Sequence, residues 1–176
     1  EARTKHTSNF FDQFGERILL PPLTEQKARI LIQKTAAGVF KETIPAGLLK
    51  HTLRFTGCRP YYIQSYYSQL NDRVNVLNRY SIAEYSTNHA HRDELEKKIL
   101  EDCQSIIRDI MRGDQLENKI LYGVARHEGI SDEILKLLIG ERDLGDSLSR
   151  LTDNHLLRKQ GAAYQIQAVV FRLWIL

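Results

Sequence analysis

The stretch LLRKQGAAYQIQ, residues 156–167, decides how the C-terminal third of this 176-residue chain folds. Two short extended runs, residues 156–159 and 164–167, lie on either side of a turn that contains Gly161. A glycine-containing turn between two such runs predicts a β-hairpin.

Three helical patterns precede this hairpin, and a short apolar segment, residues 168–176, follows it. Apolar residues recur at helical spacing from Leu116 to Ala125, and Ser131 is placed to cap a second helix. A third helix is predicted from about Arg142 to Asp153. Helix, helix, helix and hairpin in this order are typical of a winged helix-turn-helix. We therefore expect a winged-helix domain over residues 114–176.

Nearer the N-terminus, the sequence predicts three short helices that form a small bundle over residues 24–85. Thr24 is placed to cap the first helix, which Gly38 ends. Pro45 and Pro60 are placed to begin the second and third helices, and the third runs to about Leu77. The expected fold class is mainly α, a helical bundle followed by a winged helix-turn-helix with a short β-hairpin.

The segment between bundle and winged helix is predicted as a polar loop and a linker helix. Residues 80–92 are polar, and from Asp93 apolar residues recur every three or four positions until Gly113 ends the pattern. We assign the linker helix to residues 86–113. At the other end, the apolar run 18–20 before two prolines predicts a strand with no partner in the chain, which indicates a missing sheet.

The charge is weakly positive on average but unevenly distributed. The chain carries a formal net charge of +3. Residues 1–60 hold ten basic and five acidic side chains, a net +5, whereas residues 61–112 and 113–176 each have a net charge of −1. No apolar run approaches the length of a membrane span. The two cysteines, Cys58 and Cys103, are typical of reduced cytosolic thiols, although a single disulfide stays open as an alternative.

Two segments resemble a known family. The string TGCRPYYIQ, residues 56–64, resembles the TGGxPYxxQ motif in the helical lid of AAA-like and STAND-type P-loop ATPases of the archaeal type. Residues 148–176 are similar to the end of the winged helix in those proteins, and residues 10–28 to the connection between their core and lid. The resemblance implies that residues 1–23 are the end of an ATPase core or connector.

The resemblance also implies site residues and partners. Gly57, Arg59 and Pro60 would contact ATP or ADP, which the parent protein holds with Mg, and the winged helix would relay the nucleotide state to a protein partner or DNA. Cys58 departs from the family, which usually has a second glycine there, and a Cβ at that position would strain a turn that needs positive φ. The same motif also fits a plain packing corner between two helices.

The sequence lacks the parts that hydrolysis needs. Neither GxGxxG nor the phosphate-binding pattern GxxxxGKS or GxxxxGKT occurs, so we expect no catalytic residues and no hydrolysis by this chain alone. Any ATPase activity would belong to the parent, whose core domain would be the first partner of this chain. No metal site is expected, because His89, His91 and Glu94 lack a fourth ligand.

Two alternatives remain open. In the first alternative, the chain is a DNA-binding winged-helix regulator of transcription or replication. Its candidate contacts to DNA or a partner are Arg142, Arg150, Arg158 and Lys159. Carboxylates such as Asp146 and Asp153 lie among these cations and oppose phosphate binding, which favours protein contact. In the second alternative, the chain is a scaffold that docks proteins through the stripe Leu95–Ile110.

Overall fold

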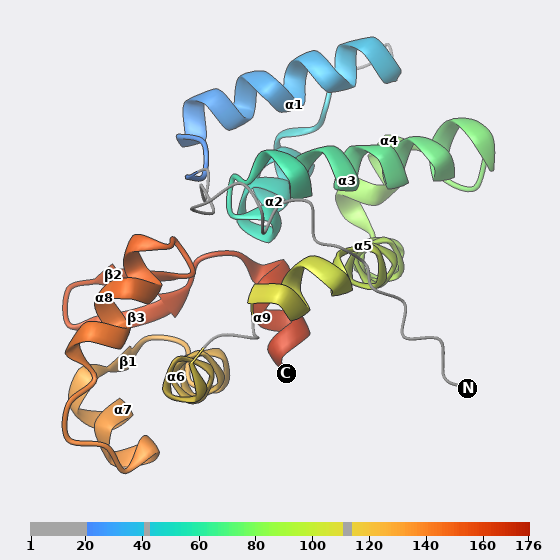
Figure 1. Ribbon diagram of the computed structural model, residues 1–176. Coiled ribbons are helices and arrows are strands. Elements are labelled where there is room, and N and C mark those ends of the chain that lie inside the picture. The colour runs from blue at the N-terminus through green and yellow to red at the C-terminus, as the bar shows by residue number, and fades with distance from the viewer. Residues whose placement is uncertain (1–20, 41–42, 111–113) are drawn as a thin grey trace, which may run out of the picture.

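A computed structural model describes residues 21–40, 43–110 and 114–176 of the chain (Figure 1). Helices dominate this part, and three short strands form one antiparallel sheet. The predicted mainly α fold with a short hairpin is therefore confirmed. The predicted strand at residues 18–20 and most of the connector assigned to residues 1–23 lie outside the described residues.

The N-terminal helices α1 (Glu25–Val39), α2 (Ala46–Thr56) and α3 (Pro60–Asn71) form a bundle, and α3 continues into a π-helical turn, η2 (Asp72–Val76). The hydroxyl of Thr24 accepts the backbone N–H of Lys27 at 3.3 Å, which confirms the predicted cap. Pro45 is the N-cap of α2 and not its first residue. The helices pack through fully buried side chains, namely Ala28, Ile32, Leu48, Ile63, Tyr66 and Leu70.

The predicted polar loop at residues 80–92 is wrong, because two helices occupy most of it. Helix α4 (Ile82–Thr87) begins with a capping box: the hydroxyl of Ser81 accepts the backbone N–H of Glu84, whose carboxylate accepts the backbone N–H of Ser81. Helix α5 (His89–Ile110) begins four residues before Asp93, where the apolar pattern starts, and three residues after the start of the linker helix assigned to residues 86–113. Its stripe of Leu95, Ile99 and Cys103 is fully buried, and the side chains of Ile106 and Ile110 lie outside the described part.

The C-terminal third has the topology of a winged helix-turn-helix. Its elements follow as α6 (Gln115–Arg126), β1 (Ile130–Ser131), α7 (Asp132–Ile139), α8 (Gly145–Asp153), β2 (Leu157–Gln160), β3 (Ala163–Ile166) and α9 (Val169–Ile175). The strands pair in the order β1-β3-β2, with Tyr164 opposite both Lys159 and Ile130. The hairpin is confirmed, but β1 was not predicted. Helix α8 begins three residues after the predicted Arg142, and in the turn before it Asp143 accepts the backbone N–H of Gly145.

Helix α9 joins the two parts of the chain. It packs against α2 and α5 of the bundle on one side and against α6 and β3 on the other (Figure 1). Val170 and Phe171 are buried in this contact. The apolar segment predicted at residues 168–176 therefore forms a helix at the junction of bundle and winged helix. No helix in the described ranges is long and apolar enough to cross a membrane.

Candidate functional site

The motif that resembles an ATPase lid forms the turn between α2 and α3. Helix α2 ends at Thr56, and both Gly57 (φ +58°) and Cys58 (φ +59°) adopt left-handed backbone before Arg59 returns to an extended conformation. The left-handed conformation of Cys58 confirms that this position needs positive φ. The carbonyl of Cys58 accepts the backbone N–H of Leu23 at 3.0 Å. The chain before α1 is therefore tied to the same turn.

Gly57 lies where the bundle touches the winged helix. A Cβ built on Gly57 would be 2.7 Å from the Cβ of Ala168 and 3.1 Å from the carbonyl oxygen of Gln167. Real Cβ atoms essentially never approach another carbon as closely as 2.7 Å. Glycine is thus required at this position by two independent facts, the positive φ and the close approach of the chain that enters α9.

Arg59 binds the winged helix directly. Its Nη2 donates to the carbonyl oxygens of Asn154 at 3.2 Å and His155 at 2.9 Å. These carbonyls directly follow α8, at the end of the helix that carries partial negative charge. Burial lowers the pKa of the Arg59 guanidinium. The two bonds thus place a half-buried positive charge on the C-terminal end of α8.

A small cavity lies between the turn and the winged helix. Arg59 and Tyr62 line it from the bundle, and His155, Leu156, Ala168 and Phe171 line it from the other side. Its volume of about 10 Å³ is that of a single water molecule at most. Burial raises the pKa of Tyr62 to about 12, so its hydroxyl stays protonated at the cavity wall. This cavity is far too small for a nucleotide.

The structure brings the three predicted nucleotide contacts together on one turn. Gly57 and Arg59 face the winged helix, and Pro60 is the first residue of α3, half-buried. Nucleotide contact by these residues stays a prediction. The structure adds a role that the sequence did not indicate, since Asn154 and His155 lie 95 and 96 residues from Arg59 along the chain. No local pattern marks such a distant carbonyl as a partner.

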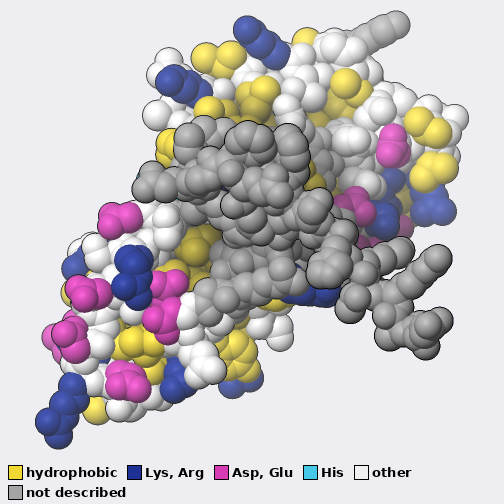
Figure 2. All heavy atoms as spheres, viewed as in Figure 1, with side chains coloured by type: hydrophobic (Ala, Val, Ile, Leu, Met, Phe, Trp, Pro, Cys, Tyr) yellow, Lys and Arg dark blue, Asp and Glu magenta, His cyan; other side chains and the backbone are white. Residues whose placement is uncertain are grey.

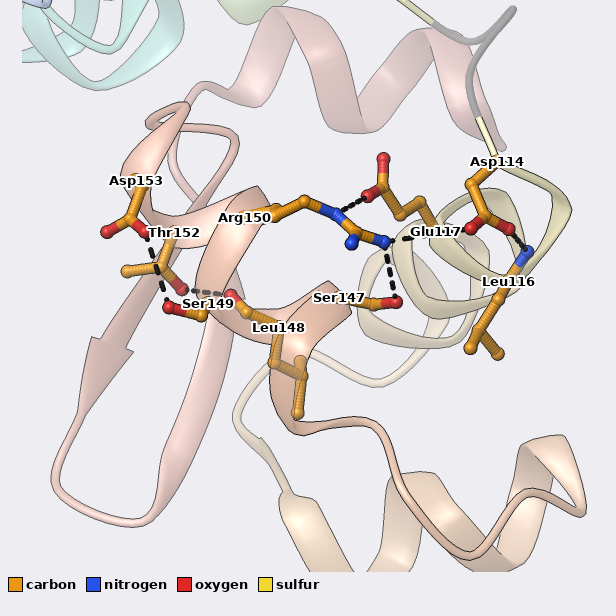
Figure 3. A network of polar contacts seen from close by, with 9 residues as sticks. All are labelled: Asp114, Leu116, Glu117, Ser147, Leu148, Ser149, Arg150, Thr152 and Asp153. Carbon is orange, nitrogen blue, oxygen red and sulfur yellow. Dashed lines mark hydrogen bonds and ion pairs between the residues drawn. The ribbon is translucent and has the colours of Figure 1, made fainter.

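Three of the four cations predicted to contact DNA or a partner are engaged within the winged helix. Figure 3 shows the Arg150 side chain reaching from α8 to Glu117 and Asp114 at the start of α6. Its Nε donates to Glu117 at 2.7 Å, and its Nη2 donates to the hydroxyl of Ser147 at 3.3 Å. The carboxylates thus neutralise the cation that the predicted recognition helix would present to a phosphate.

The other three candidate cations, Arg158, Lys159 and Arg142, lie apart from the Arg150 network. Arg158 donates to the side-chain oxygen of Gln165 on the neighbouring strand at 2.9 Å. The Lys159 ammonium lies over the ring of Tyr164, 5.4 Å from its centre. Arg142 is exposed before α8 and makes no hydrogen bond or ion pair with another described residue. The exposed wing therefore carries two cations that are only weakly held.

Sequence reasoning missed one polar contact inside the bundle. His51 of α2 pairs with the buried carboxylate of Glu96 on α5. Glu96 lies on the same side of α5 as the buried Ile99 and Cys103, so its helical position was a signal that this carboxylate needs a partner. His91 stacks on Tyr80 with ring centres 3.6 Å apart, and Glu94 pairs with Arg73. No metal-binding group occurs among residues 21–40, 43–110 and 114–176.

Comparisons of the chain with family models, with curated proteins and with solved structures give no match.

Proposed function

We propose that the chain is the C-terminal regulatory part of a cytoplasmic AAA-like or STAND-type ATPase. The bundle is the lid that contacts ATP or ADP, and the winged helix relays the nucleotide state to a protein partner. The phosphate-binding loop, the Mg ion and the attacking water belong to the core of the parent protein. The chain alone hydrolyses nothing.

The observation that supports this proposal is the double hydrogen bond from Arg59 to the end of α8. An anionic phosphate attracts a guanidinium more strongly than a neutral carbonyl does. A phosphate within reach would draw Arg59 away from Asn154 and His155 and would loosen the winged helix. The nucleotide and the winged helix therefore compete for one guanidinium, which is the differential contact that a relay requires.

The nucleotide in this proposal lies on the side of the turn that faces away from the winged helix. The cavity of about 10 Å³ beside Arg59 is too small to hold it. Pro60 begins α3, a helix of 12 residues, so the first backbone N–H groups of that helix lack helical partners. Free N–H groups at a helix start favour phosphate binding. Arg59, directly before α3, fits the same role.

The test uses the intact product of the gene that encodes this chain. ATP affinity, ATP turnover and hydrogen exchange of residues 154–171 are measured for the natural protein, for Arg59→Ala and for Arg54→Ala. Arg54 is the matched control, an exposed arginine on α2. We expect ATP to increase exchange at the junction in the natural protein and in Arg54→Ala. In Arg59→Ala, exchange is already raised and ATP no longer changes it.

Two results would overturn the proposal. One is an intact protein that lacks a phosphate-binding loop or does not bind ATP. The other is an Arg59→Ala variant whose exchange responds to ATP like that of Arg54→Ala.

The topology of the winged helix also favours DNA binding, and its wing exposes Arg158 and Lys159. The charges on the winged helix favour DNA binding less than its topology does. Arg150 is neutralised by Glu117 and Asp114, and α8 exposes Asp146 and Asp153. Two wing cations supply only weak, salt-sensitive binding. We therefore place protein contact first.

A further inference from the structure

Helix α7 presents an apolar face that nothing in the described chain covers. Leu137 is 83% exposed, Leu138 is 55% exposed and Ile134 is 53% exposed. The three residues follow the spacing i, i+3, i+4 and therefore lie on one face of an eight-residue helix. Single exposed leucines are common on protein surfaces, but a cluster of this kind marks an interaction site. We call these three residues the α7 face.

Carboxylates flank the α7 face along the chain. Glu133 and Glu141 lie four residues before and four residues after Leu137, and both are exposed. Asp143 follows, with Arg142 between Glu141 and Asp143, so the three carboxylates and this arginine carry a net charge of −2. Lys136 does not change this sum, because it pairs with Asp132 at 2.8 Å. A partner of the α7 face therefore needs an apolar centre with positive charges beside it.

Helix α1 carries such a surface. Ile30 is 46% exposed, and Lys27 and Lys34 lie three residues before and four residues after it on the outer side of the helix. Glu25, the acidic residue of α1, is not free to offset them, because it pairs with Arg29 at 2.6 Å. We call Lys27, Ile30 and Lys34 the α1 face, with a net charge of +2. The two lysines are about 10 Å apart along the helix axis.

We propose that the α7 face of one copy of this chain binds the α1 face of a second copy. Helix α1 lies at the top of the molecule and α7 at the bottom left, so one copy cannot bring its own two faces together (Figure 1). Figure 2 shows Lys or Arg side chains along the upper edge and several Asp and Glu side chains over the winged helix. Unlike faces give a head-to-tail contact that builds rows or rings, or two such contacts across a two-fold axis where the copies lie antiparallel. This contact does not depend on nucleotide binding.

Sedimentation of the 176-residue chain over a range of protein and salt concentrations tests the contact. The α7 variant is Glu133→Lys with Leu137→Ser, and the α1 variant is Lys27→Glu with Lys34→Glu. We expect the natural chain to associate at low salt. Either variant should associate at least about tenfold more weakly, because the α7 variant loses the net negative charge and the central leucine of its face, and the α1 variant presents a negative face to a negative one. Leu173→Ser is the control, since Leu173 is an exposed leucine outside both faces.

Mixing the two variants separates a head-to-tail contact from other kinds of association. Each variant keeps one natural face, so an equimolar mixture should form a complex of two molecules and stop there. Three results would overturn the proposal: a natural chain that stays monomeric at every concentration, α1 substitutions that leave association unchanged, or a Leu173→Ser control that weakens it equally. Circular dichroism of each variant shows that it is folded, and the α1 variant tests the proposal if the α7 variant is not.

Discussion

Replacing Gly57 by alanine should weaken the junction between bundle and winged helix. The left-handed backbone at φ +58° costs a residue with a Cβ about 1–2 kcal/mol. The new Cβ would also lie 2.7 Å from the Cβ of Ala168, and such overpacking costs about 1–3 kcal/mol. The sum predicts that Gly57→Ala lowers the free energy of unfolding by about 2–5 kcal/mol.

Two further glycines separate these contributions. Gly140 has φ +78° with no atom within 4 Å of an added Cβ, so Gly140→Ala should show the backbone cost alone, about 1–2 kcal/mol. Gly38 lies in α1 with no atom within 4 Å, so Gly38→Ala should stabilise the chain by about 0.5–1 kcal/mol. Adding Ala168→Gly to Gly57→Ala removes the closest contact and should recover at least about 1 kcal/mol. Urea unfolding followed by circular dichroism measures all four.

A Gly57→Ala variant that loses no more stability than Gly140→Ala would contradict this prediction. The close approach to Ala168 would then carry no energy, and the bundle and winged helix would not be packed at this point.

Three other predictions concern the core and the wing. Glu96→Ala should lower the free energy of unfolding in urea by about 1–3 kcal/mol, because it leaves His51 without its buried partner. Glu101→Ala, at an exposed position on the same helix, should change it by less than about 0.5 kcal/mol. Equal effects would contradict a stabilising His51–Glu96 pair. The urea midpoint should fall as pH rises from 9 toward 11. Burial raises the pKa of the Cys103 thiol from 9.0 to about 11, so in this range the unfolded chain loses the thiol proton and the folded chain keeps it. A Cys103→Ala variant should show a shallower fall, and a flat profile for the natural chain would count against burial of the thiol. Labelled duplex DNA should bind more weakly than about 1 µM at physiological salt in fluorescence anisotropy, and Arg150→Ala should leave that affinity unchanged; tight binding that depends on DNA sequence would favour the alternative function.

Local patterns in the sequence predicted the local structures well. Thr24 caps α1 as its position before a helical pattern indicated, and the turn around Gly161 joins two paired strands. The prediction of a loop for residues 80–92 was wrong because it followed the polar composition and not the helix-start signal within this segment. Ser81 and Glu84 have the spacing of a capping box, which marks a helix start. Strand β1 was not predicted because it has two residues, too few for an alternation of apolar and polar side chains to appear.

Long-range contacts could not be predicted in the same way. The sequence marked Gly57 and Arg59 as a tight turn beside a helix start, and the structure has that turn. The partners Asn154, His155 and Ala168 come from elements about 100 residues later and bind through backbone atoms or a methyl group. Backbone carbonyls are present at every residue, so no residue type identifies which one a guanidinium binds.

The contacts of α9 indicate where the winged helix would separate from the bundle. Arg172 donates to the carbonyl of Ala125 at 2.9 Å and pairs with Glu128 at 2.7 Å, so polar bonds hold α9 to α6. Toward α2 and α5 the same helix contributes buried apolar side chains such as Phe171. Apolar packing has no required direction, whereas hydrogen bonds fix partners and geometry. Helix α9 would therefore move with the winged helix, and the bonds of Arg59 to α8 are the directional contacts that such a movement has to break.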